Sequence, residues 1–203
     1  MFIKPKIVVA ALATMATTLL VLTQTAATPP GPASYKLEGA WIAKVPTTPL
    51  QWSYVFSPSD PSGRRATLSG SLQVSIPAAL IVPGFPEFDY SSPSVGEAVM
   101  TGPDTAKFTA VGYSIKKVAP SPEYPFLEQV TVIWVTSGEV KFTAPGKTET
   151  THHVAYYLPA ADGNGDGLPD EGSTPFACLP PTTSIDTQVG LMPPCTPTPP
   201  TEP

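Results

Sequence analysis

Two aspartates and one asparagine alternate with glycines in a short segment that ends in a third aspartate, Asp162-Gly-Asn164-Gly-Asp166-Gly-Leu168-Pro-Asp170. Side-chain oxygens at alternate positions of a tight loop can converge on one point. Calcium is a hard cation that takes roughly six to eight oxygen ligands, so the spacing predicts a calcium site. Asp, Asn and Gly are also the commonest turn residues, and a solvated acidic turn is the alternative.

The segment 162–171 resembles the D-x-[DN]-x-[DN]-G opening of EF-hand, thrombospondin type 3 and dockerin calcium loops. Ser173 stands where an EF-hand carries its bidentate glutamate, and Pro169 excludes a flanking helix. We therefore expect a structural Ca²⁺ ion that orders the exit of the preceding strand. The resemblance implies side-chain ligands from Asp162, Asn164 and Asp166, a backbone carbonyl from Leu168, and a direct or water-bridged oxygen from Asp170.

Residues 1–27 have the organisation of a secretory signal peptide. Lys4 and Lys6 precede an apolar stretch that ends at about Leu22, and small residues follow up to Ala27. The apolar stretch is shorter than the roughly 20 residues of a spanning helix. We expect cleavage, no membrane span afterwards, and export to an extracellular, cell-surface or periplasmic location.

The two cysteines, Cys178 and Cys195, both follow the predicted calcium loop. Export would expose them to an oxidising environment, so a disulfide between them is predicted, with intermolecular pairing as the alternative. The bond would tie down part of residues 180–203. This Pro/Thr-rich composition cannot build a core, and we expect an extended tail.

Charge and motifs narrow the possible functions. The formal net charge is −5 and no basic run occurs, which argues against nucleic acid as a partner.

His152 and His153 are neighbours on a predicted strand and point to opposite faces, so they cannot chelate one ion. Glycosidase chemistry requires two carboxylates positioned across a cleft, and the single loop pair Glu87 and Asp89 does not establish such an arrangement. Familiar catalytic motifs are missing, and a non-enzymatic protein is expected.

Alternating polar and apolar residues predict a β-rich domain. Residues 66–76 alternate strictly, and Trp52, Tyr54 and Phe56 alternate before them, which predicts an antiparallel hairpin. Residues 130–135 predict a central strand.

Turn signals connect that central strand to its neighbours. A tight turn is expected at Ser137-Gly138 and another at Pro145-Gly146, followed by a strand to Leu158. Further strands are expected at 37–45 and 107–118. Residues 77–103 predict long loops with one short strand, and no helix is expected after the leader.

These elements form one expected domain at 35–160, after a linker at 28–34 and before the calcium loop at 161–179. Its antiparallel strands must close into an up-and-down barrel or pack as a sandwich to cover their edges. Gly39-Ala40-Trp41 resembles the Gly-x-Trp that opens lipocalin-type barrels, which implies a barrel that carries small apolar ligands. A sandwich of no particular family is favoured over that barrel.

The expected function is an exported, non-enzymatic structural or adhesive module stabilised by calcium, with an unknown protein or glycan as its partner. The alternative is a lipocalin-like carrier of a small apolar ligand. An unrecognised hydrolase is the third possibility.

Overall fold

The computed structural model describes residues 35–46, 48–71, 75–120 and 127–190. The predicted leader and linker and Cys195 lie outside these residues. The described residues form nine strands, a short α-helix, α1 (Ser75–Ile81), and a 3₁₀ turn, η1 (Pro159–Ala161). The strands are β1 (Gly39–Lys44), β2 (Gln51–Pro58), β3 (Arg65–Ser71), β4 (Tyr90–Ser91), β5 (Ser94–Met100), β6 (Thr105–Lys117), β7 (Glu128–Ala144), β8 (Lys147–Tyr157) and β9 (Ala177–Gln188).

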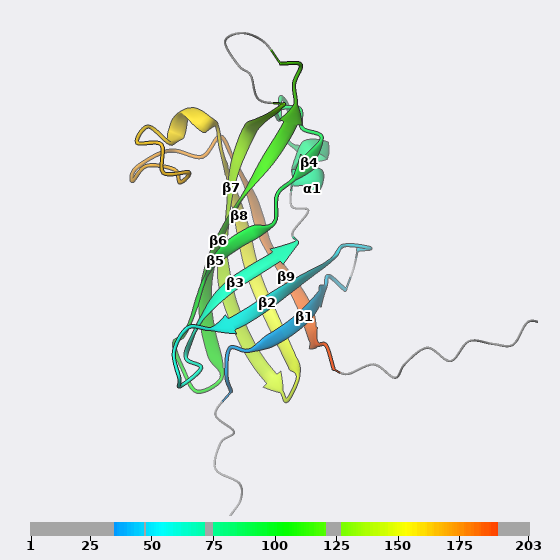
Figure 1. Cartoon of the computed structure of the whole chain (residues 1–203). Coiled ribbons are helices and arrows are strands. Elements are labelled where there is room, and N and C mark those ends of the chain that lie inside the picture. Colours follow the sequence, from blue (N-terminus) through cyan, green and yellow to red (C-terminus); the bar gives the residue numbers. More distant parts are fainter. Residues whose placement is uncertain (1–34, 47, 72–74, 121–126, 191–203) are drawn as a thin grey trace, which may run out of the picture. The chain divides into compact units, whose positions relative to one another are not determined.

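The sheet closes on itself as an antiparallel up-and-down barrel (Figure 1). Its order is β4-β6-β5-β3-β2-β1-β9-β8-β7, and β7 pairs again with β6. Eight strands therefore complete the ring. The short β4 pairs with β6, on the same side of β6 as β5. The barrel, which the sequence analysis gave as the alternative, is confirmed, and the favoured sandwich is wrong. Pairing between β1 and β9 closes the sheet and removes its edges.

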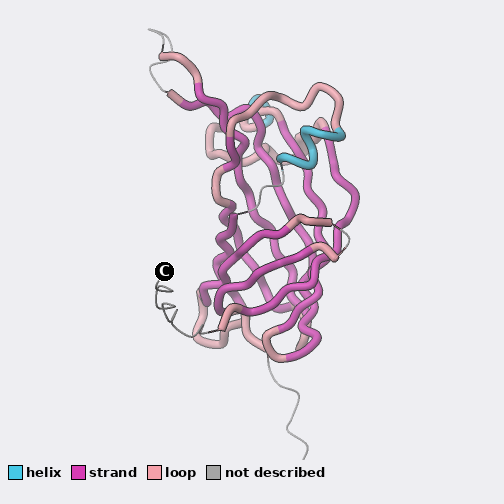
Figure 2. The backbone as a smooth tube through the Cα atoms, turned by 90° about the vertical axis from the view of Figure 1, so that its right-hand side faces the viewer, coloured by secondary structure: helices cyan, strands magenta, loops and turns pink. Residues whose placement is uncertain are grey.

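Inward-facing residues fill the barrel in two clusters. One contains Trp41, Phe56 and Phe142, and the second contains Trp134 and Tyr156. Helix α1 contributes a fully buried alanine to the second cluster. Figure 2 shows both helical segments at the same end of the barrel. The barrel interior is thus a packed core that α1 covers at one end.

A glycine on β6 allows the largest interior side chain to pack. A Cβ atom at Gly112 would lie 2.2 Å from Cζ2 of Trp134, far inside van der Waals contact. Trp134 is fully buried on β7, directly across the ladder from Gly112. The missing side chain is what lets β6 and β7 coil around the indole.

The structure corrects two predicted boundaries. The strand expected over 66–76 ends at Ser71 as β3, and α1 begins at Ser75. Pro77 lacks the N–H that a strand ladder needs but is tolerated in the first turn of a helix. The turn expected at Ser137-Gly138 is also wrong, because β7 continues through it and Gly138 pairs with β6 and β8.

The expected tail boundary at residue 180 is wrong as well. Residues Ala177–Gln188 form β9, the strand that completes the barrel. Pro180 and Pro181 lie where the register with β8 shifts, and prolines are tolerated at such irregularities. The hairpin of β2 with β3 and the turn at Pro145-Gly146 are confirmed.

Candidate ligand-binding site

The barrel wall is incomplete beside the first half of β9. In the described residues β1 pairs with β9 only at residues 185–188, whereas β8 pairs with β9 from Ala177 onward. A pocket of about 240 Å³, here called the seam pocket, lies in this part of the wall. It is lined by Pro49, Leu50, Gln51, Trp52, Pro77, His152, His153, Val154, Leu179, Pro180 and Thr182.

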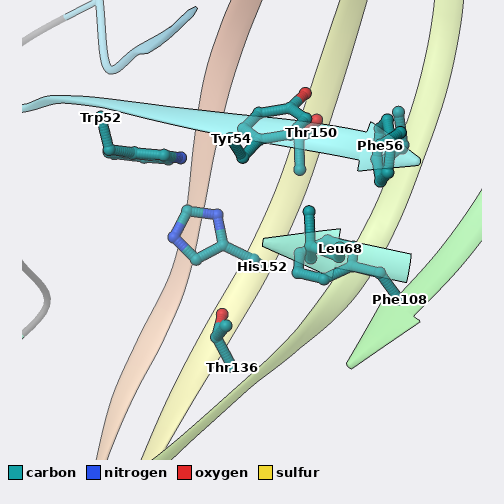
Figure 3. A pocket seen from close by; sticks show the side chains of 9 residues that line it. Trp52, Tyr54, Phe56, Leu68, Phe108, Thr136, Thr150 and His152 are labelled. Atoms are coloured by element: carbon teal, nitrogen blue, oxygen red, sulfur yellow. The ribbon is translucent and has the colours of Figure 1, made fainter. Parts of the chain in front are cut away.

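A second, much smaller space lies inside the barrel (Figure 3). This inner cavity has a volume of about 20 Å³, enough for roughly one water molecule. Its walls come from β2, β3, β6, β7 and β8. They are formed by Trp52, Tyr54, Phe56, Leu68, Phe108, Thr136, Val140, Thr150 and His152.

Trp52 and His152 separate the two spaces. Each side chain lines both the seam pocket and the inner cavity. Their rings meet edge to face, with centroids 5.1 Å apart and an interplanar angle of 85° (Figure 3). The aromatic pair therefore lies between the two spaces.

Two residues that line the inner cavity carry buried polar atoms that have no partner among the described residues. These atoms are Oγ1 of Thr136 and Nδ1 of His152. The exposed fractions of the two residues are 1% and 6%. A buried polar group without a partner costs about 1–3 kcal/mol of folding free energy.

Burial lowers the pKa of His152 below its ordinary value. The Asp186 carboxylate opposes that shift, and the neighbouring His153 adds to it. His152 is therefore neutral near pH 7, and its ring offers one donor and one acceptor.

Other hydroxyls near the cavity are already engaged by a buried carboxylate. Asp186 of β9 is fully buried and accepts four hydrogen bonds. The hydroxyls of Tyr54, Thr148 and Thr150 donate to Oδ2 at 2.7, 3.1 and 2.5 Å. Ser184 donates to Oδ1 at 2.6 Å. This cluster ties β2, β8 and β9 together and turns the Tyr54 and Thr150 hydroxyls toward Asp186.

The predicted calcium residues lie together in the loop after η1, at the same end of the barrel as α1 (Figure 1). Asp162 accepts from the N–H groups of Gly165, Asp166 and Gly167 at 2.9–3.0 Å. Asp170 accepts from the N–H of Gly163 at 2.9 Å. The carboxylates thus brace the loop through its own backbone.

The remaining predicted ligands complete this network. Asn164 and Asp166 accept from the N–H groups of Asp166 and Leu168, both at 2.8 Å. The Tyr113 hydroxyl of β6 donates to the Gly167 carbonyl at 3.0 Å and anchors the loop. Over the described part of the chain, no three His, Cys, Asp or Glu side chains gather as a metal site. Calcium binding stays a prediction.

Other residues considered in the sequence are distributed over the barrel. His152 and His153 do point to opposite faces, one buried and one exposed. Glu87 pairs with Lys116 on the surface. Cys178 is exposed on β9, and its predicted partner lies outside the described residues, so the disulfide stays a prediction.

The sequence did not reveal the site itself. The alternation of Trp52, Tyr54 and Phe56 correctly predicted which residues of β2 share a face. Nothing in the sequence around Thr136 or Leu179 indicated that these residues line a cavity or a pocket. The gap in the barrel wall depends on the pairing between β1 and β9, which a local pattern does not show. The histidine at position 152, within a Thr-rich strand, was the one available signal.

Comparisons with protein-family models, with curated proteins and with solved structures found no match. Within the described residues, no helix is long and apolar enough to cross a membrane.

Proposed function

We propose that this protein is a carrier of a small, largely apolar ligand that it holds in the seam pocket. The observation that carries the proposal is the arrangement around His152. A mostly apolar pocket of about 240 Å³ lies on one side of this residue, and a small apolar cavity lies on the other. Ligand sites have mostly apolar walls with a few polar groups, and the polar side chains of the seam pocket are those of Gln51, His152, His153 and Thr182.

The size of the pocket limits the ligand. Typical sites for drug-sized molecules measure about 300–1,000 Å³, and the seam pocket is smaller. A molecule with one to three rings, or a short aliphatic chain, fits this volume. A purely structural or adhesive barrel has no need for an apolar pocket in its wall, and this favours the carrier over such a module.

Binding of an uncharged fluorescent probe, N-phenyl-1-naphthylamine, tests the proposal. Its fluorescence should rise and saturate when the protein is added. Leu179→Trp, which fills the seam pocket, should abolish the saturable signal. Val95→Trp adds the same side chain on the outside of β5, where Val95 is 59% exposed, and should leave the signal unchanged. Equal binding by both variants would exclude the seam pocket as the site.

We also propose that the protein is exported and that the loop 162–171 binds Ca²⁺ in that environment. The support is the leader-like sequence of residues 1–27 and the ligand spacing of the loop. Millimolar Ca²⁺ should raise the melting temperature, and a chelator should reverse the rise. Asp162→Asn should remove the response. A melting temperature that is indifferent to Ca²⁺ would rule the ion out.

A further inference from the structure

A surface hollow begins where the described chain leaves the barrel. Val189 follows β9 directly and donates its N–H to the Ala40 carbonyl at 2.8 Å, and residues 191–203 continue outside the described part of the chain. The hollow, here called the exit groove, has a volume of about 440 Å³. It is lined by Ile42, Lys44, Pro46, Gln51, Ile185 and Thr187.

The exit groove adjoins the seam pocket. Gln51 lines both of them. Strand β9 also runs along both, with Ile185 and Thr187 in the groove and Leu179 and Thr182 in the pocket. The two hollows therefore follow β9 from the exit of the chain to the incomplete part of the barrel wall.

This path presents apolar side chains to the solvent. Ile42, Leu50 and Ile185 are large apolar residues along it, and their exposed fractions are 39–45%. Neighbouring exposed apolar side chains are typical of an interaction surface. Lys44 is the one charged side chain among the described residues that line the two hollows. An occupant of the path is therefore apolar and largely uncharged.

The segment that follows β9 in the sequence has this chemistry. Residues 191–201, Leu-Met-Pro-Pro-Cys-Thr-Pro-Thr-Pro-Pro-Thr, include no charged residue. Proline-rich segments favour the polyproline II conformation, and aromatic-lined grooves bind that conformation at low entropic cost. The seam pocket offers such a lining, with Trp52 and three prolines, Pro49, Pro77 and Pro180.

The length of the segment matches the distance along the path. Thr182 lies eight residues before Gly190, which corresponds to about 26 Å of extended strand. Residues 191–200 span about 31 Å as a polyproline II helix. Gly190 supplies the backbone freedom that a reversal of the chain needs. Residue 200 can therefore reach the seam pocket from the end of β9.

We propose that residues 191–203 fold back along β9, occupy the exit groove and cover the seam pocket with Pro199 and Pro200. A ligand that enters the pocket displaces these prolines, so the segment and the ligand compete for one site. The competition rests on the proposed carrier function, whereas the docking of the segment does not.

A nitroxide label at residue 201 tests the docking by NMR. The full chain carries Thr201→Cys together with Cys178→Ser and Cys195→Ser, so the label attaches at one position and every proline is kept. The docked segment should broaden the backbone amide signals of Gln51, His153 and Thr182 most strongly. It should leave the signal of Val95 sharp, because β5 lies four strands from β9 in both directions around the ring. Equal broadening on the two sides of the barrel, or broadening confined to residues beside Gly190, overturns the docking.

Matched substitutions show whether the exit groove holds the segment. Ile185→Ser removes apolar surface from the groove and should abolish most of the broadening at Thr182. Val95→Ser shortens an exposed β-branched side chain on the opposite wall and should leave the broadening unchanged. Should Ile185→Ser fail to fold, Ile42→Ser on β1 changes the same groove, and the same loss is required of it. Broadening that survives in a folded groove variant overturns the docking.

The probe N-phenyl-1-naphthylamine tests the competition. Ile185→Ser should bind it several-fold more tightly than the parent, because a pocket that is covered part of the time binds with a reduced apparent affinity. A saturating amount of the probe should also remove the broadening at Thr182 in the labelled chain. Equal affinities, or broadening that persists at saturation, overturn the competition while the docking stands. A probe that binds neither protein overturns the carrier function, and the label then decides the docking by itself.

Discussion

At the scale of single residues, the barrel depends on a buried carboxylate without a buried cation among the described residues. Asp186 is surrounded by hydroxyl donors from β2, β8 and β9. Burial and the nearby carboxylate raise the pKa of Tyr54 far above its ordinary value, so its hydroxyl stays protonated and donates. The cluster therefore fixes the register of three strands through polar contacts in the interior.

Tyr54→Phe removes one donor from Asp186 and should lower the free energy of unfolding by about 1.5–3 kcal/mol, the range for a hydrogen bond to a charged group. Urea denaturation measures the change. Tyr157→Phe, a half-exposed position on β8, is the matched control and should cost less than about 0.5 kcal/mol. Equal losses in the two variants would contradict a special role for the Asp186 cluster.

His152 should make stability depend on pH. The unfolded chain takes up this proton near the ordinary pKa of 6.5, but burial delays protonation in the folded state to lower pH. The contribution to stability is therefore full above about pH 6.5 and declines as the pH falls below that value. His152→Phe should lose this component of the decline below about pH 6.5, which urea titrations at several pH values measure. An identical pH profile in the variant and the parent would argue against the buried, neutral imidazole.

At the scale of elements, the strands coil tightly because small residues lie where strands approach each other. Gly112→Ala would bring a methyl group onto the Trp134 indole and should destabilise the barrel by about 1–3 kcal/mol, as overpacking does. Gly190→Ala meets no atom within 4 Å and should change stability by less than about 0.5 kcal/mol. Thermal or urea unfolding compares the two. A neutral Gly112→Ala would mean that β6 and β7 can separate without cost.

Much of the strand pattern could be predicted because it is local. Alternation along β2, β3 and β8 shows which side chains face inward, and Pro145-Gly146 marks a turn whatever surrounds it. Helix α1 was missed because residues 75 and 76 continue the alternation of β3 in the sequence.

The strand β9 could not be predicted from its sequence. Its first half contains two adjacent prolines, and its second half buries Ser184 and Asp186 while exposing Ile185, the reverse of the usual pattern. Only the hydroxyl donors of other strands make that reversal stable. The residues that line the seam pocket also lie far apart in the sequence. No local pattern could therefore predict the pocket.

At the scale of the whole molecule, the incomplete pairing of β9 joins fold and function. A fully paired eight-stranded ring of this kind would enclose only the inner cavity, which is too small for a ligand. The short pairing of β1 with β9 leaves room in the wall for the seam pocket, and α1 supplies Pro77 to one side of it. The proposed carrier function therefore depends on the short pairing between β1 and β9 more than on any single residue.

A crystal structure of the protein grown with N-phenyl-1-naphthylamine shows directly whether the seam pocket binds a ligand. We expect electron density for the probe in the seam pocket, between Trp52 and Leu179 and against His152. An empty seam pocket, or a probe bound only to the outer surface of the barrel, would contradict it.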